Sequence, residues 1–258
     1  MTAVPSSLAA LRAVVHREAR IRVTNAAFIF WDVLSPLAYL LVFGVGMDAA
    51  LGAPATAPGI DYNAFFLGGV LGMASFTIAS NTAWSFFMDR DNGIFYEMLT
   101  YPLSRSQYLL GKVLFNVGIA LLQAALAVGL GAALLGIPMV WSLLPLLALV
   151  VAVGTAGWFF FYAIFALRIR RNDAFNTVTS IFYFVFLFAS SMFYPLDPLP
   201  AWLRTVALAN PITWHVDVLR FATIGLGHPP TLVWQAVAFV AFATGCFVIA
   251  TRFLDRQE

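Results

Sequence analysis

The stretch that decides the fold is residues 113–167, VLFNVGIALLQAALAVGLGAALLGIPMVWSLLPLLALVVAVGTAGWFFFYAIFAL, which contains no Asp, Glu, Lys or Arg. A helix of about 20 apolar residues spans the hydrocarbon core of a bilayer, so this stretch is too long for one span. Gly136-Ile137-Pro138 and Pro145 interrupt it, and Gly and Pro favour a turn. The stretch therefore predicts a hairpin of two membrane-spanning helices, 113–135 and 143–167.

The composition extends this interpretation to the whole chain. Of its 258 residues, 62% are hydrophobic and 10% are charged, and the mean hydropathy is +0.88. A soluble domain carries about 25% charged residues, so lipid is the expected solvent. Four further apolar segments have the length of a span: 23–47, 62–88, 174–194 and 231–251. Together with the hairpin they predict an all-α integral membrane protein in which residues 1–258 form one transmembrane domain with six spans.

The basic residues indicate how the spans are oriented. Lys and Arg concentrate in the cytoplasmic segments of membrane proteins. With the N-terminus inside, the cytoplasmic segments hold all of the 14 basic residues except Arg204 and Arg220. The sequence therefore predicts that the N- and C-termini both face the cytoplasm. An odd number of spans does not keep this pattern.

Three segments outside the spans differ in character. Residues 5–22 combine an apolar face with several arginines, which is typical of an amphipathic helix at the inner membrane surface; a charged flank that sets the topology is the alternative. Residues 89–112 form the longest cytoplasmic loop. Residues 195–230 are too apolar for a free extracellular loop, so we expect short re-entrant helices there.

Two stretches carry a more specific pattern. Residues 89–112 read DRDNGIFYEMLTYPLSRSQYLLGK, and residues 193–220 contain FYPL, LPAWL, NPIT and DVLR in that order. The first resembles the inner loop of ABC type-2 exporter permeases, which runs through Gly and Glu to Pro-x-Ser-Arg and Leu-Gly-Lys. The second is similar to the segment before the last span in the same family, and the drug and lipo-oligosaccharide exporters are the nearer branch. Phe95-Tyr96 departs from the family pattern, which often has Thr-Leu or Leu-Glu there.

The resemblance implies a fold and a set of partners. Such permeases have the six-helix type V ABC exporter fold, with an interface helix, a cytoplasmic coupling helix and re-entrant outer helices. They form dimers, here expected to be homodimers, with two cytoplasmic ABC ATPase subunits in the bacterial plasma membrane. ATP and magnesium are expected in the ATPase, because this chain has no GxxxxGK[ST] loop. In the chain itself we expect no cofactor, metal, catalytic residue or nucleic-acid contact.

The candidate residues for the contact with the ATPase are Gly93, Glu97, Pro102, Arg105, Arg17 and Arg20. Gly93 is expected to end the second span, and Pro102 to end a short helix over 94–100. Glu97 is expected to pair with Arg17 or Arg20, or with a basic residue of the ATPase; an ordinary solvated acid is the alternative. Arg105 is either a second ATPase contact or only a cytoplasmic positive charge.

Within the spans, the candidates for the transport path are Asp32, Ser80, Asn81, Phe182 and Phe186. Asp32 requires a partner or water, since an ionised carboxylate in a membrane is costly. Ser80 and Asn81 either line a path for a polar group or form hydrogen bonds between helices. Phe182 and Phe186 either line a path for an amphiphile or contact lipid and core. In the outer segment the resemblance singles out Pro195, Trp202, Asn210, Pro211, Asp217 and Arg220.

The favoured function is the permease subunit of an ATP-driven exporter of an amphiphile, which is a lipid, a lipid-linked saccharide or a hydrophobic drug. Two other classes stay open. An intramembrane lipid-modifying enzyme requires clustered His, Asp or Glu, which this sequence does not show. A stand-alone ion-coupled carrier requires paired membrane carboxylates or broken helices, and only Asp32 offers itself. The sequence names neither the substrate nor the ATPase, and a heterodimer stays open beside the expected homodimer.

Overall fold

The computed structural model describes residues 7–25, 27, 30–51 and 60–255, and every element within them is a helix. Helix α1 covers Ser7–Thr24 and corresponds to the expected interface helix over 5–22. A helical run follows that consists of η1 (Phe30–Leu34), α3 (Ser35–Ala38), η2 (Tyr39–Gly44) and α4 (Val45–Leu51). Residues 5 and 6 of the expected interface helix, and residues 26, 28 and 29 of the first expected span, lie outside the described residues.

The first apolar helix differs from the expected 23–47 in its start and in its geometry. Helix α1 extends to Thr24, whose hydroxyl donates to the carbonyl of Arg20, so residues 23 and 24 belong to α1 and not to the first span. Among the described residues, the long apolar helix that follows is Phe30–Ala50. Both η1 and η2 are π-helical, a wider geometry that is frequent at functional sites. Asp32 lies in η1 and is buried.

The next three helices are α5 (Tyr62–Asp91), α6 (Ile94–Met98) and α7 (Arg105–Leu134). Capping side chains set where the two long helices begin. The carboxylate of Asp61 accepts a hydrogen bond from the backbone N–H of Ala64 at 2.7 Å, and Ser104 and Gln107 form a capping box. Because α7 begins at Arg105, the non-helical part of the expected loop 89–112 is shorter than the sequence predicts.

The second half of the chain contains η3 (Trp141–Leu143), α8 (Leu144–Arg168), α9 (Asn172–Phe188), α10 (Ala201–Ala209), α11 (Pro211–Ile224) and α12 (Pro229–Asp255). Gly136 has a φ of +65° at the turn between α7 and α8, where the hairpin turn is expected. With 9 and 14 residues, α10 and α11 are too short to cross a bilayer.

Helix α9 ends at Phe188, whereas the fifth span is expected to extend to residue 194. The side chain of Asn210 explains this early end. Its Nδ2 donates hydrogen bonds to the carbonyls of Phe186 and Ala189, at 2.9 and 2.7 Å, and so satisfies acceptors that the helix leaves open. The chain after Phe188 is therefore free to fold back towards α10.

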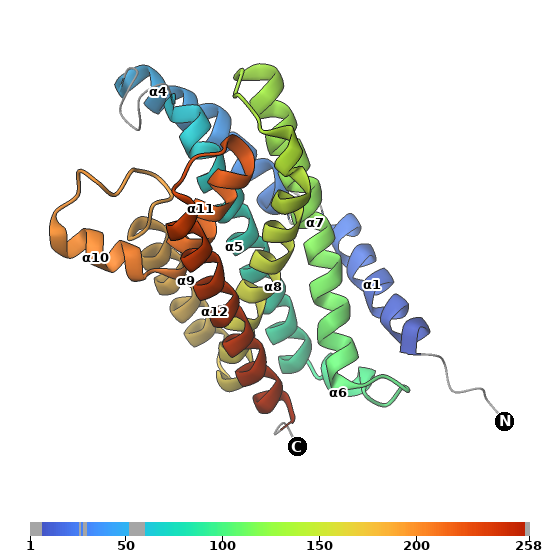
Figure 1. Ribbon diagram of the computed structural model, residues 1–258. Helices are drawn as coiled ribbons and strands as arrows, with labels where there is room; N and C mark the ends of the chain where they lie inside the picture. The colour runs from blue at the N-terminus through green and yellow to red at the C-terminus, as the bar shows by residue number, and fades with distance from the viewer. Residues whose placement is uncertain (1–6, 26, 28–29, 52–59, 256–258) are drawn as a thin grey trace.

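Helix α5 lies within the bundle, and the other long helices surround it (Figure 1). In its most apolar window 89% of the residues are buried, against 28–39% in the other long apolar helices, which leave faces for lipid. Among the described residues, five helices are long and apolar enough to span a membrane: Phe30–Ala50, α5, α7, the η3–α8 run and α12. Helix α9, which is expected as the fifth span, has 17 residues and is not among these five helices. The start of α1, α6 and the end of α12 lie at one end of the bundle (Figure 1).

Two glycines let the short helix α11 pack deeply into the bundle. A Cβ at Gly68 of α5 would lie 2.9 Å from the Cβ of Arg220, and a Cβ at Gly154 of α8 would lie 2.0 Å from Nε2 of His215. Neither position has room for a larger residue without movement of α11. Nε1 of Trp158 donates a hydrogen bond to Nδ1 of His215 at 3.3 Å, which holds the imidazole ring in place.

Candidate functional site

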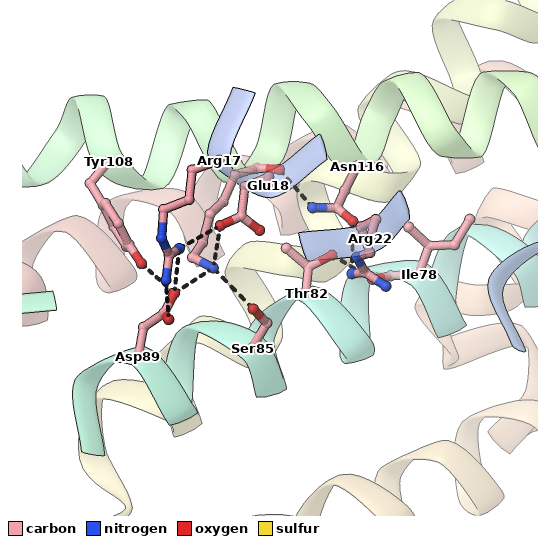
Figure 2. A network of polar contacts seen from close by, with 10 residues as sticks. Arg17, Glu18, Arg22, Ile78, Thr82, Ser85, Asp89, Tyr108 and Asn116 are labelled. Carbon is pink, nitrogen blue, oxygen red and sulfur yellow. Dashed lines mark hydrogen bonds and ion pairs between the residues drawn. The ribbon is translucent and has the colours of Figure 1, made fainter. Parts of the chain in front are cut away.

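Charged side chains from α1, α5 and α7 meet near the end of the bundle that carries α6, which we call the inner end. Arg17, Glu18, Asp89, Tyr108 and Lys112 form this inner charge cluster (Figure 2). The guanidinium of Arg17 donates to both carboxylate oxygens of Asp89, at 2.7 and 3.1 Å. Lys112 Nζ lies 2.7 Å from Asp89 Oδ2 and donates to Glu18 Oε1 at 2.9 Å. The hydroxyl of Tyr108 also donates to Asp89.

Burial makes the charge balance of this cluster important. The Lys112 side chain is 0% exposed, and those of Glu18 and Asp89 are 1% and 8% exposed. Two cations face two carboxylates, so the cluster is neutral. Burial lowers the pKa of the Arg17 guanidinium, but the hydrogen bond and charge of Asp89 outweigh it and raise this pKa above its ordinary value. Removing one member would leave an uncompensated buried charge.

A second polar group continues the cluster towards the middle of the bundle. The guanidinium of Arg22 pairs with Asp32 and donates to Asn116 Oδ1 at 3.0 Å. The amide of Asn81 donates to Asp32 Oδ1 at 2.7 Å. Asn116 Nδ2 donates to the carbonyl of Lys112, which joins the two groups. Asp32 and Asn81, two expected path residues, therefore lie together, and their contacts connect helices.

Most members of these two groups escaped the sequence analysis, yet their spacing carries a signal. Residues four apart lie on one face of a helix. Asn81, Ser85 and Asp89 are spaced by four on α5, Tyr108, Lys112 and Asn116 on α7, and Glu18 and Arg22 on α1. Three helices, two of them apolar, thus carry matching polar stripes, and a search for such stripes would have found the sites of contact.

A groove of about 530 Å³ separates α1 from α6 at the inner end, and its lining is mostly apolar. Glu97 is exposed and lines this groove, together with Val14, Met98 and Pro102. The expected pairing of Glu97 with Arg17 or Arg20 is wrong for Arg17, whose guanidinium is held by Asp89 and Glu18. For Arg20, which is exposed, no ion pair with Glu97 occurs in the described part of the chain.

The other expected coupling residues lie around α6. Gly93 has a φ of +77° and forms the N-cap of α6 directly after α5, as its sequence position predicts. The helix ends at Met98, so Pro102 follows it by several residues and does not end it. Arg105 donates to the carbonyls of Leu254 and Asp255 at 3.1 and 3.3 Å. The negative end of the α12 dipole stabilises a cation at this position.

An apolar cavity of about 530 Å³ lies between the first apolar helix, α5 and α9. Its lining is rich in aromatic rings, including Tyr39, Phe43, Tyr183 and Phe188. The expected path residues Phe182 and Phe186 do not line it. Their rings pack against Phe161, with centroids 5.2 and 5.6 Å away. The face of the aromatic helix α9 that lines the cavity is therefore the one with Tyr183 and Phe188, not the one with Phe182 and Phe186. Ser80 is partly buried and is not among the lining residues either.

At the outer end, Asp217 is the centre of a second polar cluster. Its Oδ1 accepts hydrogen bonds from Arg220 and from the hydroxyl of Ser191, both at 2.8 Å, and its Oδ2 accepts one from Gln235 Nε2 at 2.7 Å. Arg220 also donates to the carbonyls of Phe65 and Ser191. This outer cluster, Ser191, Asp217, Arg220 and Gln235, joins α5, α11 and α12. Asp217 and Arg220, which are two of the six expected outer residues, thus lie together.

The remaining outer residues shape the segment 195–230. Asn210 is the N-cap of α11 and accepts a hydrogen bond from the backbone N–H of Ile212, and Pro211 takes the first helical position, which suits its fixed φ. Trp202 is 70% exposed on α10, and Pro195 lies in the segment between α9 and α10. These residues set the path of the chain and do not share a site with Asp217, except for Pro195, which lines a cavity beside it.

The fold and these clusters define the class of protein, which is a multi-helix membrane protein with a short helix projecting at one end and two re-entrant-length helices near the other. Within that class, residues 9–224 match the ABC-2 type transporter family. The chain belongs to this family, as the sequence motifs indicated. Membership points to the membrane subunit of an ABC transporter.

Three relatives are named as transport or nodulation proteins. Nodulation protein J of Rhizobium leguminosarum bv. trifolii is 29% identical over 237 residues, which cover 90% of this chain and 87% of that protein. The transport permease ycf38 of Porphyra purpurea is 25% identical, covering 73% of this chain and 65% of that protein. YbhR of Escherichia coli (strain K12), named as a multidrug ABC transporter permease, is 25% identical, covering 63% and 44%. The chain thus spans just under two thirds of ycf38.

Proposed function

We propose that this chain is the permease subunit of an ATP-driven exporter that moves an amphiphile out of the cytoplasm or the inner leaflet. In this proposal two copies form a homodimer in the cell membrane, with both termini in the cytoplasm and α9 as the sixth span of a type V fold. Two ABC ATPase subunits bind ATP and magnesium on the cytoplasmic side. The family membership and the permease names of the relatives support this assignment.

The observation that carries the proposal is the position of α6. This short helix lies at the inner end of the bundle (Figure 1). Its residues line the apolar groove against α1. A groove of about 530 Å³ with the acid Glu97 on its wall suits the insertion of a partner's apolar side chain beside a basic one. Directly behind α6, Asp89 connects the end of α5 to α1 and α7. A movement of α6 would therefore reach three helices.

The proposal of an amphiphilic substrate is supported by the apolar cavity at the outer half of α9. Its aromatic lining offers contact to a hydrocarbon chain, and Tyr62 within that lining donates its hydroxyl to the carbonyl of Phe193. An ion-coupled carrier is less well supported, because the carboxylate of Asp32 is already held by Arg22 and Asn81. In the proposed dimer the cavity faces the partner copy.

The test is charge reversal at Glu97 in the complex reconstituted with its ATPase. Since Glu97 is exposed, Glu97→Arg is expected to leave insertion and dimerisation unchanged while substrate-stimulated ATP hydrolysis and transport fall at least tenfold. Glu97→Gln is expected to have a smaller effect. The matched control is Asp173→Arg, which reverses an exposed acid in the first turn of α9, next to the other inner connection. Full stimulation of the ATPase by the Glu97→Arg complex would overturn the proposal.

A further inference from the structure

A cavity of about 410 Å³ lies beside the outer cluster, under the segment that leads from α9 to α10. It differs from the apolar cavity in that a larger part of its wall is polar. Asp217, Arg220 and Gln235 form its floor, and Asp197, Arg204 and His228 lie around them. Pro195 lines both this cavity and the apolar one, so a single short segment separates them.

One buried atom of a side chain that lines the cavity has no hydrogen-bond donor in the described part of the chain. Gln235 is 3% exposed, and its Nε2 donates to the carboxylate of Asp217. A carboxylate only accepts hydrogen bonds, which fixes the orientation of the amide. Its Oε1 is buried and has no hydrogen-bond partner among the described residues. Leaving such an acceptor unpaired is unfavourable, so a bound donor would be stabilised there.

The charges around the cavity select the kind of donor. Asp217 pairs with Arg220 at 2.8 Å and Asp197 pairs with Arg204 at 3.1 Å, so acids and cations balance. An anionic ligand would meet the two carboxylates, and a cationic one would meet the two guanidinium groups. A neutral group with several hydroxyls can instead donate to Gln235 Oε1 and Asp217 and accept from the arginines.

The geometry points to a binding site for a neutral polyhydroxyl group, such as a sugar, in this outer cavity. The inference rests on the proposed function in one respect: a hydrocarbon chain in the apolar cavity and its hydroxylated headgroup in the polar cavity would meet at Pro195. The site would then receive the headgroup of the exported amphiphile. A free sugar has the same chemistry, and the experiment separates the two sources.

Binding is measured by calorimetric titration of the purified chain in nanodiscs, with empty nanodiscs as the blank. The probes are hexyl maltoside, hexylphosphocholine and hexyltrimethylammonium, which share one chain and differ in headgroup, together with free maltose. Hexyl maltoside is expected to bind saturably and at least tenfold more tightly than the two charged-headgroup probes. If free maltose binds as tightly, the source is a free sugar; if it binds more weakly, the source is an amphiphile. Both results support the site.

A variant pair then assigns the binding to the unpaired acceptor. Gln235→Met keeps the size of the side chain and removes the amide, so maltoside binding is expected to weaken about tenfold. The control is Gln123→Met, at a glutamine of α7 that is 1% exposed and does not line the cavity, and it is expected to leave the binding unchanged. Thermal unfolding of both variants shows whether they fold.

Equal binding of the three hexyl probes by the wild-type chain, or no saturable binding of any, would overturn the inference whether or not the variants fold. Unchanged maltoside binding by folded Gln235→Met would do the same. None of these measurements uses the ATPase. A failure of the Glu97→Arg test with intact maltoside selectivity would therefore count against the proposed coupling and leave the headgroup site standing.

Discussion

The inner charge cluster and the outer cluster both hold carboxylates against cations, but they differ in what surrounds them. Around Asp89 the hydrogen-bonding groups belong to three helices of the chain, and Lys112 is 0% exposed. The side chain of Asp217 is 22% exposed and a cavity adjoins it. Gln235 Oε1 beside it is buried and accepts no hydrogen bond from the described residues. The closed cluster holds helices in place, whereas the open cluster has room and hydrogen-bonding capacity for a ligand.

The difference follows from the helices that supply the two clusters. The inner one joins the long helices α5 and α7 through matching polar stripes, with α1 laid against them. Close approach of α1 and α7 depends on Gly111, where a Cβ would lie 2.6 Å from Cγ1 of Val14. The outer cluster involves α11, a helix of 14 residues that leaves space beside it.

The largest effect is expected from Asp89→Ala. This change leaves Lys112 fully buried and shares the remaining carboxylate of Glu18 between two cations, so we expect the free energy of unfolding in micelles to fall by about 3–5 kcal/mol. Chemical denaturation followed by tryptophan fluorescence measures it. The double variant Asp89→Ala with Lys112→Ala removes the excess charge and is expected to recover part of the loss. A cost below about 1 kcal/mol for the single variant would show that the cluster is not closed.

A smaller effect is expected from Asp217→Ala. Arg220 keeps its bonds to two carbonyls and stays within 3.8 Å of the Phe65 ring centroid, and water can enter from the cavity. The expected loss in the same assay is about 1–3 kcal/mol. The control is Arg204→Ala, which breaks an exposed pair and is expected to cost less than about 1 kcal/mol. If Asp217→Ala cost as much as Asp89→Ala, the outer cluster would be as closed as the inner one.

Much of the helical architecture could be predicted from the sequence, because long apolar runs and Gly or Pro turns act locally. The turn at Gly136 and the αL residue Gly93 are examples. The ends of helices were less predictable where a distant residue sets them. Asn210 ends α9 from 21 residues or more away, and no local pattern at Phe188 indicates this.

The contacts of the sites were less predictable than the residues. Asp217 and Arg220 were found together, since they lie on one helix. The pairing of Arg17 with Asp89 depends on how α1 and α5 are rotated towards each other, and this rotation follows from the packing of three helices. The same reason explains why Phe182 and Phe186 face Phe161 while Tyr183 and Phe188 line the cavity.

The central claim is that energy from a separate ATPase enters this chain at α6. The most direct measurement is photo-crosslinking from residue 97 in the assembled complex. The chain's one cysteine, Cys246, is 7% exposed and is replaced in the Cys246→Ala background. Glu97→Cys or Trp141→Cys is then introduced and labelled with a benzophenone maleimide. Trp141 is 59% exposed and begins η3, between α7 and α8. The turn between these two helices lies at the opposite end of the bundle from α6 (Figure 1).

On irradiation with the proposed ABC ATPase partner, the account predicts a covalent product between the two subunits from residue 97 and none from residue 141. Preincubation of the ATPase with unlabelled wild-type chain is expected to reduce the product, since both compete for one surface. Absence of a product from residue 97 in a complex that hydrolyses ATP, or an equal yield from residue 141, would contradict the account.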